Sequence, residues 1–362
     1  MDRRQFLQTT VAGTALGIAS SGEPNDIPQL RKMTPANLLV GSAVSYRELQ
    51  DVAFTALLAE QANIVVPENE MKWAVIHPEP DRFDFTRGDA SVSFAKEHGQ
   101  KVRGHNLCWH EQLPKWFAGY ASPQNAADLL RQHIAEVAGH YRGQIQSWDV
   151  VNEAINVDDG RPDGLRNSPW LKLVGPDYIV IAFRAARQAD PRAILTYNDY
   201  GIEQDGPKFD AKRKAVLGMV TALLDQNAPV QAVGLQSHLK AGTKPMNWTA
   251  LHAFMNAIEK LGLQIFVTEL DVDDSDVPGN VNEHDAVVAN VYGDYLRNVL
   301  QHKSVKAVLT WGLTDRDTWL NSPGLRGNGP LRRPLPFDSD LKPKPAFYAI
   351  LDAISGAEAR KI

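Results

Sequence analysis

The sequence predicts an α/β fold in one domain, a (β/α)8 TIM barrel, and three observations predict it. Eight short apolar runs recur along the chain, and longer amphipathic stretches separate them over about 320 residues. No internal repeat, low-complexity tract or Pro/Ser-rich linker divides the sequence into modules. Polar and aromatic residues collect where the apolar runs end, which is where a barrel of this kind carries its active site.

Composition supports one large globular domain. The 362 residues are 43% hydrophobic and 22% charged, which suits a chain with a sizeable core. The net charge of -5 and the lack of a basic stripe argue against nucleic acid as a partner. Cys108 is the only cysteine, so no internal disulfide can form. Eight Trp and nine Tyr supply aromatic faces suited to stacking on sugar rings. We expect a monomer.

Residues 1–21 are predicted to be a targeting segment that precedes the fold. Arg3 and Arg4 stand before Phe6 and Leu7, and residues 9–20 form a weakly apolar run that is too short to span a bilayer. This pattern resembles a twin-arginine export signal, with cleavage near residues 17–19. We therefore expect a periplasmic or secreted protein that has no membrane attachment once the signal is removed. The alternative is a disordered cytoplasmic N-terminus with a chance arginine pair.

The remaining elements follow from apolar periodicity, and they give a domain over residues 30–356. The predicted strands are 39–44, 63–67, 101–108, 145–151, 193–198, 232–237, 264–270 and 307–313. The main predicted helices are 49–61, 125–141, 178–188, 212–226, 250–261 and 285–301, and a last helix follows residues 342–348. A doubly wound open sheet is the alternative. It would normally carry a Gly-rich phosphate loop after its first strand, where this chain has Ser45, Tyr46 and Arg47.

Two glutamates mark the ends of two separate apolar strands. Glu153 comes directly after the run 145–151, and Glu269 lies near the end of the run 264–270. Either glutamate alone could be a satisfied core residue. Together they indicate one site, because cleavage of a glycosidic bond requires a pair of carboxylates.

The other strand ends contribute further polar and aromatic residues to the same face. In chain order these are Glu68, Asn69, Lys72, His105, Trp109, Gln112, Asn152, Tyr200, Gln236, His238, Asp271 and Trp311, with Trp319 in the loop beyond the last strand. Buried polar groups cost free energy unless they are partnered, so seven polar strand ends on one face favour a functional site. By contrast, Met71 is predicted to be core. Trp73, Trp148 and Trp170 suit packing as well as they suit the site.

The two-residue period of a strand predicts which of these side chains meet. Gln236 and His238 should share one face, and so should Glu269 and Asp271. His238 would then lie beside two carboxylates, where it could orient a nucleophile and keep it ionised. Asn152 and Glu153 are adjacent, so the strand must end or bulge there for both to face the site.

Competing motifs do not fit. His110 and Glu111 begin a zinc-protease HExxH pattern, but Pro114 stands where the second histidine belongs. His105 and His110 are five residues apart, with no further metal-type ligands beside them, so we expect no metal. The sequence contains no GxSxG motif.

Four motifs in this order resemble the endo-1,4-β-xylanases of glycoside hydrolase family 10, over residues 35–354. The motifs are Glu68-Asn69-x-Met71-Lys72-Trp73, Gly104-His105-x-x-x-Trp109-His110, Trp148-Asp149-Val150-Val151-Asn152-Glu153-Ala154 and Thr268-Glu269-Leu270-Asp271. The resemblance implies that Glu153 is the general acid/base and Glu269 the nucleophile. It also implies hydrolysis of xylan or xylo-oligosaccharides with retention, by double displacement, without a cofactor.

The resemblance implies roles for the remaining candidates as well. Glu68, Asn69, Lys72, His105, Trp109 and Asn152 match positions that grip the sugar on the non-reducing side of the cut. Gln236 and His238 match nucleophile-supporting positions, Trp311 and Trp319 match sugar-stacking ones, and Tyr200 matches the leaving-group side. Asp271 and Asn152 are further candidates for nucleophile support, and Gln112 and Gln236 for substrate binding.

The chain departs from the family pattern at Cys108, at Glu111 and in the loop 324–334, which carries Arg326, Arg332 and Arg333. The departures at Glu111 and in the loop bear on substrate preference rather than on the chemistry. Two alternatives stay open: a related retaining barrel enzyme that acts on glucan, and a non-catalytic glycan-binding barrel.

Overall fold

Nine parallel strands close into a barrel, as a computed structural model of the chain shows for residues 27–242, 246–326 and 329–361. The predicted signal segment lies outside these described residues. The strands are β1 (Leu39–Val44), β2 (Ile64–Pro67), β3 (Lys101–His105), β4 (Ser147–Asn152), β5 (Ile194–Asp199), β6 (Ala232–Leu235), β7 (His238–Lys240), β8 (Gln264–Asp273) and β9 (Val305–Thr310). Pairing of β1 with β9 and of β6 with β8 completes the ring. The predicted (β/α)8 barrel is confirmed.

The count of nine arises because one barrel position is divided between two strands. β6 pairs with β8 up to Leu235, and β7 pairs further along β8, where His238 lies opposite Asp271. Between them Ser237 adopts a left-handed conformation with φ 64°. The prediction of one unbroken strand over 232–237 is therefore wrong, and β6 ends two residues earlier.

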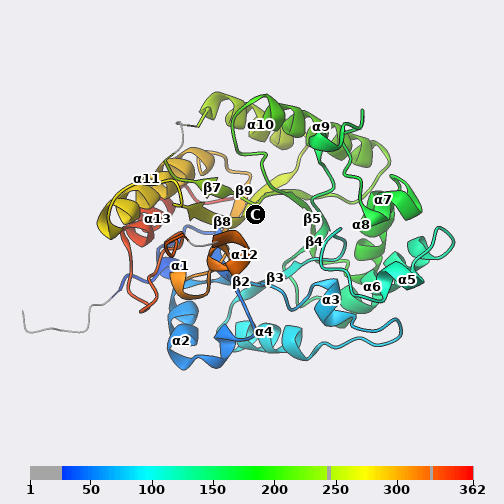
Figure 1. Ribbon diagram of the computed structural model, residues 1–362, viewed down its shortest axis with the longest axis horizontal. Helices are drawn as coiled ribbons and strands as arrows, with labels where there is room; N and C mark the ends of the chain where they lie inside the picture. The colour runs from blue at the N-terminus through cyan, green and yellow to red at the C-terminus, as the bar shows by residue number, and fades with distance from the viewer. Residues whose placement is uncertain (1–26, 243–245, 327–328, 362) are drawn as a thin grey trace, which may run out of the picture.

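Helices surround the strands on all sides (Figure 1). They are α1 (Leu30–Met33), α2 (Val52–Gln61), α3 (Trp73–Ile76), α4 (Thr86–Glu97), α5 (Phe117–Tyr120), α6 (Ala126–His140), α7 (Pro169–Val174), α8 (Tyr178–Ala189), α9 (Pro207–Asp225), α10 (Trp248–Lys260), α11 (Val281–Val299), α12 (Pro323–Arg326) and α13 (Pro345–Ser355). Short 3-10 turns add η1 (Glu48–Gln50), η2 (Val157–Asp159), η3 (Asp315–Asp317) and η4 (Trp319–Asn321). In the described part of the chain, no helix combines the length and apolar character needed to cross a membrane.

The barrel has an apolar layer outside the strands and a mixed filling inside. Buried side chains between strands and helices form the main core, which includes Met71 and the predicted packing residues Trp73, Trp148 and Trp170. The interior holds a smaller apolar cluster together with the ion pair of Arg103 and Asp149, whose side chains are each 1% exposed. A buried ion pair requires further hydrogen bonds to offset desolvation, and His105 supplies one, with Nδ1 2.9 Å from Asp149 Oδ2.

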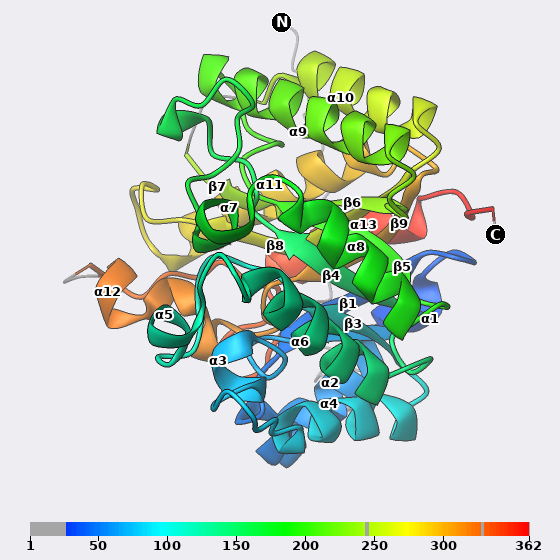
Figure 2. The same cartoon turned by 90° about the vertical axis from the view of Figure 1, so that its right-hand side faces the viewer.

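The two ends of the barrel carry different elements. Figure 2 shows α5 and α12 at one end and the red C-terminal segment at the other. Since α5 follows β3 and α12 follows β9, the first end is the one to which the strands point with their carboxyl termini. The strand ends and the loops at this end carry the residues that the sequence singled out.

Candidate active site

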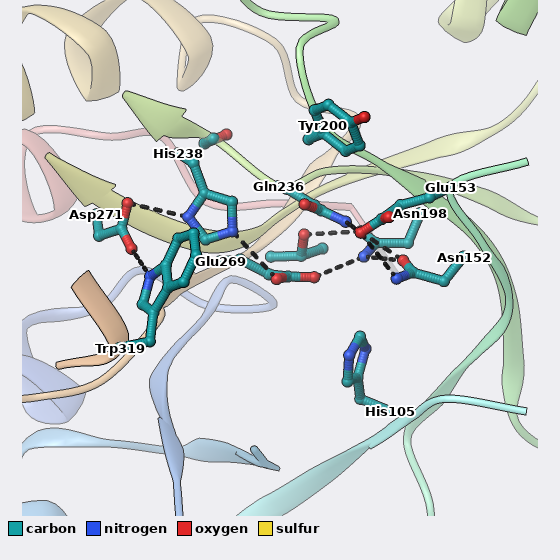
Figure 3. Close-up of polar contacts among 12 residues, drawn as sticks. His105, Asn152, Glu153, Asn198, Tyr200, Gln236, His238, Glu269, Asp271 and Trp319 are labelled. Atoms are coloured by element: carbon teal, nitrogen blue, oxygen red, sulfur yellow. Dashed lines mark hydrogen bonds and ion pairs between the residues drawn. The ribbon is translucent and has the colours of Figure 1, made fainter. Parts of the chain in front are cut away.

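Glu153 and Glu269 lie in one hydrogen-bonded cluster at the carboxyl ends of the strands (Figure 3). β4 ends at Asn152, and Glu153 adopts a left-handed conformation with φ 57°. This turn lets both side chains face the cluster, as the prediction of a strand end there required. Glu269 lies within β8 and is only 5% exposed.

Three neutral side chains donate hydrogen bonds to the Glu153 carboxyl. Trp109 Nε1 lies 2.9 Å from one oxygen, while Gln236 Nε2 and Asn152 Nδ2 lie 3.0 and 3.2 Å from the other. Removal from water raises the pKa of Glu153, the bonds from Gln236 and Trp109 oppose that rise, and the charges of Asp199 and Glu269 add to it. A raised pKa favours the protonated form of Glu153, which can act as an acid.

Glu269 has the opposite character. Burial alone would raise its pKa, but hydrogen bonds from His238 and Asn198 and the electrostatic effects of His105 and His238 lower it to about 2. Asn198 Nδ2 lies 2.7 Å from one oxygen, and His238 Nε2 lies 3.3 Å from the other. Glu269 is therefore a carboxylate at neutral pH.

His238 lies between Glu269 and Asp271 and contacts both carboxylates. The two-residue period of the strands predicted this arrangement. His238 Nδ1 lies 2.9 Å from Asp271 Oδ1, and the other oxygen of Asp271 accepts a 2.7 Å hydrogen bond from Trp319 Nε1. Burial lowers the pKa of His238, but the two carboxylates outweigh it and raise the pKa well above its ordinary value. A cationic imidazole held at both nitrogens fixes the orientation of Glu269.

An amide network joins the two glutamates. Asn152 Oδ1 accepts hydrogen bonds from Asn198 Nδ2 at 2.8 Å and from Gln236 Nε2 at 3.3 Å. Asn198 was not among the predicted site residues, although it stands at the end of the predicted fifth strand. Thr268 Oγ1 donates to Asn198 Oδ1 at 2.8 Å, so the amide must present its nitrogen to Asn152 and Glu269.

A second group of predicted residues surrounds a buried lysine. Lys72 is 5% exposed, and its Nζ lies 3.0 Å from Asn69 Oδ1, 5.2 Å from the ring centre of Trp109 and 5.7 Å from that of Trp311. Burial lowers the pKa of Lys72, while Glu269, Glu68 and Glu153 raise it and limit the fall. Lys72 therefore does not extend from the surface as a solvated charge.

Glu68 and His105, two further predicted residues near Lys72, also interact with neighbours in the site. Burial raises the pKa of Glu68, and the nearby Lys72 charge opposes the rise. His105 is 2% exposed, and its ring centre lies 5.2 Å from that of Trp311. Trp311 is only 7% exposed and packs in the cluster inside the barrel, so its predicted stacking on sugar stays a prediction.

Two predicted residues lie at the edge of the cluster. Tyr200 is 38% exposed and follows β5. Figure 3 shows Tyr200 on the Glu153 side of the site, across the cluster from His105. Gln112 is exposed with φ 47°, and its carbonyl accepts a 2.9 Å hydrogen bond from the Ala74 amide. Its contact with substrate stays a prediction.

The structure shows where the departures noted in the sequence lie. Cys108 is fully buried, and burial raises the pKa of its thiol well above the ordinary value. Arg333 forms two 2.8 Å hydrogen bonds with Asp285, and the Arg332 guanidinium donates to the carbonyls of Leu320 and Leu325. These two arginines hold the loop that follows Trp319. Glu111 is 62% exposed at the side chain and lies 3.6 Å from His110.

Metal ligation has no candidate set in the described residues, which contain no group of three or more His, Cys, Asp and Glu that could hold an ion. His105 is hydrogen-bonded to Asp149. Burial lowers the pKa of His110 to about 4, and the charge of Arg166 acts in the same direction.

Comparison with known proteins gives one consistent result. Residues 29–353 match the family described as glycosyl hydrolase family 10. Endo-1,4-beta-xylanase B of Thermotoga neapolitana is 34% identical over 340 residues, which cover 92% of this chain and 94% of that protein.

Two solved structures show the same fold. Native xylanase 10B from Thermotoga maritima has a TM-score of 0.82 at 36% identity and covers 90% of this chain and 98% of that one. Xylanase 10B from Thermotoga petrophila RKU-1, solved in complex with xylobiose, has a TM-score of 0.81 at 34% identity, with coverage of 92% and 98%.

Proposed function

The chain belongs to glycosyl hydrolase family 10, and on that premise we propose that it is an endo-1,4-β-xylanase that cleaves xylan with retention of configuration. The observation that carries this proposal is the pair of glutamates with opposite pKa shifts in one cluster. A proton donor and an ionised nucleophile are the two groups that a retaining glycosidase requires. The xylanase names of the similar proteins support xylan and xylo-oligosaccharides as substrates.

In the first step, Glu269 attacks the anomeric carbon while Glu153 transfers its proton to the departing glycosidic oxygen. The bond from carbon to the Glu269 oxygen replaces the bond to the leaving sugar, so a glycosyl-enzyme forms with inverted configuration. His238 and Asn198 keep Glu269 ionised and oriented for this attack. They hold the carboxylate by its two different oxygens, which prevents it from rotating.

In the second step, the same groups exchange roles. The ester at Glu269 carries no negative charge, so one of the influences that raise the pKa of Glu153 is gone. Glu153 is now an anion and takes a proton from water as the water attacks the anomeric carbon. Two inversions give net retention, and both carboxyl groups return to their starting states.

The roles of the two glutamates can be distinguished by product stereochemistry. An aryl β-xylobioside with a good leaving group should still form the glycosyl-enzyme in Glu153→Ala, and added azide should then release a β-glycosyl azide. In Glu269→Ala no covalent intermediate forms, so azide that enters the vacated space should attack once and give the α-azide.

Nuclear magnetic resonance of the isolated azides makes the measurement, and the parent enzyme with azide is the control. Reversal of the two anomers would exchange the assigned roles. A parent that releases reducing sugar from mixed-linkage glucan but not from xylan would instead favour the glucan alternative. A parent inactive on every polysaccharide tested would favour a glycan-binding protein.

We also propose that the protein is exported by the twin-arginine route and works in the periplasm or outside the cell. The paired Arg3 and Arg4 and the lack of any possible internal disulfide support this proposal. Arg3→Lys combined with Arg4→Lys should retain the protein in the cytoplasm, as measured by fractionation and immunoblotting. Unchanged export of the double variant would contradict the assignment.

A further inference from the structure

Arg166 joins the acid/base residue to the aromatic residue at the edge of the site. The Arg166 side chain is half-buried in the loop between β4 and α7. Its Nε donates a 2.7 Å hydrogen bond to the main-chain carbonyl of Glu153, and its Nη2 donates a 3.0 Å hydrogen bond to the Tyr200 hydroxyl. Its own amide donates to the Ala154 carbonyl at 2.7 Å. One guanidinium thus contacts two separate strand ends.

Tyr200 is held from a second direction by a buried lysine. Lys212 of α9 is 4% exposed, and its Nζ lies 3.6 Å from the centre of the Tyr200 ring. The same Nζ lies 2.7 Å from Asp199 Oδ1, which also accepts a 2.9 Å hydrogen bond from the Tyr200 amide. Hydroxyl, ring and main chain of Tyr200 are therefore all restrained, although the side chain is 38% exposed. An exposed ring that is held so firmly is suited to receive a ligand without losing conformational entropy.

The hydrogen bond from Arg166 to the Glu153 carbonyl also restrains the main chain at Glu153. A non-glycine residue at φ 57° is in a sparsely populated conformation that the surroundings must enforce. The Glu153 amide is fixed by the Asn198 carbonyl at 2.9 Å, and Arg166 fixes the carbonyl. Because the guanidinium is planar and its donors are in a rigid fork, the position of Glu153 becomes linked to that of Tyr200.

We propose that Arg166 is a positioning residue that holds Glu153 and Tyr200 in one geometry, so that a sugar leaving over Tyr200 receives its proton from Glu153. This inference rests on the proposed function, in which Glu153 protonates the leaving oxygen and Tyr200 lies on the leaving-group side. It adds that the two are coupled through one side chain that contacts neither the bond being cleaved nor the nucleophile. Leu or Met at this position would fill the space but could not make either hydrogen bond.

Two substrates distinguish this role from a purely structural one. Cleavage of a xylo-oligosaccharide places a sugar on the leaving-group side and needs protonation by Glu153. Cleavage of a nitrophenyl β-xylobioside requires no sugar on the leaving-group side. It also requires no protonation by Glu153, because nitrophenolate leaves without an acid. In Arg166→Met, we expect kcat/KM to fall about 10- to 100-fold on the oligosaccharide, since hydrogen bonds from a charged donor are lost, and to change less than about threefold on the nitrophenyl substrate.

Tyr200→Phe supplies the second measurement, because it keeps the ring and removes the hydroxyl to which Arg166 donates. If Arg166 acts partly through Tyr200, the double variant should lose no more than about twofold beyond Arg166→Met on the oligosaccharide. Arg161→Met is the matched control. Arg161 lies in the same loop and forms its ion pair with Asp163, so its loss should leave both substrates unaffected.

Three results would overturn the inference. They are an equal fall on both substrates accompanied by a lower melting temperature, no fall on either substrate, or fully additive losses in the double variant. A parent enzyme that cleaves neither substrate would instead refute the proposed function, and the inference with it. Since the parent is assayed first, the two failures cannot be confused.

Discussion

Three glutamates, Glu48, Glu153 and Glu269, show how neighbouring side chains decide the protonation state of one residue type. Removal from water raises the pKa in each case. Glu269 faces the imidazolium of His238, and its pKa falls to about 2. Glu48 accepts 2.8 Å hydrogen bonds from the amide and hydroxyl of Ser45. No cation is among the main causes of its pKa shift, and its pKa is about 7. Glu48 should therefore be a neutral acid in the folded protein below pH 7.

Glu48→Gln is predicted to make the protein less sensitive to alkaline pH. The folded pKa of about 7 exceeds the ordinary value of 4.5, so the stability that Glu48 contributes is present below pH 4.5 and is lost as pH rises through 7. A shift of this size corresponds to roughly 3 kcal/mol. The variant should match the parent at pH 4.5 and exceed it at pH 8, as urea unfolding at both pH values will measure.

Glu60→Gln provides the control for that comparison, because Glu60 is exposed on α2. It should change the free energy of unfolding by no more than about 0.5 kcal/mol at either pH. If Glu48→Gln and the parent keep the same difference at pH 4.5 and pH 8, Glu48 does not titrate in the way its burial indicates.

At the scale of elements, the sequence was most informative where a pattern is long and buried. The predicted first strand has the observed bounds, and helices such as α6 and α8 lie within two residues of their predicted limits. α4 was missed because its buried face mixes Gly88 and Ser91 with Val92, Phe94 and Ala95, which weakens its apolar periodicity. Gly88 is required there, since a Cβ would lie 2.3 Å from the Tyr141 hydroxyl.

The limits of prediction at the site also follow from local structure. Glu153, Glu269, His238 and Asp271 could be found because strand ends and a two-residue period place them. The break at Ser237 could not be found, since its left-handed conformation depends on tertiary contacts, including one of 2.6 Å between its hydroxyl and that of Tyr295. Gln236 reaches Glu153 beside this break and not through regular alternation along a strand. Arg166 was missed because its guanidinium contacts Glu153 and Tyr200 only in the folded chain.

At the scale of the whole molecule, the last residues fasten the barrel where its first and last strands meet. Arg360 is 3% exposed, and its guanidinium donates to the carbonyls of Val305 and Leu300 at 2.8 and 2.9 Å. Its amide donates to the Ala36 carbonyl at 2.8 Å, just before β1 begins. Since Ala36 precedes β1 and Val305 begins β9, these contacts lie at the amino-terminal ends of the strands, opposite the active site. Figure 2 shows the C-terminal segment at this end of the barrel.

Arg360→Met should lower the free energy of unfolding by about 2–4 kcal/mol, because buried carbonyls would lose a charged donor. Turnover per folded molecule should not change, since the site is at the other end of the barrel. Chemical denaturation and activity assays below the transition will measure both quantities. Arg297→Met on α11 is the control, as the ion pairs of Arg297 are exposed and contribute little. Equal stability of the two variants would refute the role of Arg360.

The backbone at Glu153 has a consequence for protein engineering. A left-handed conformation costs a residue other than glycine about 1–2 kcal/mol, and Glu153 also keeps a carboxyl away from water beside another anion. Glycine would remove both penalties at once and would abolish proton transfer. A mutant library ranked only by resistance to heat therefore rewards the loss of this side chain. Directed evolution of the enzyme must select for product formation in every round in which it selects for thermal stability.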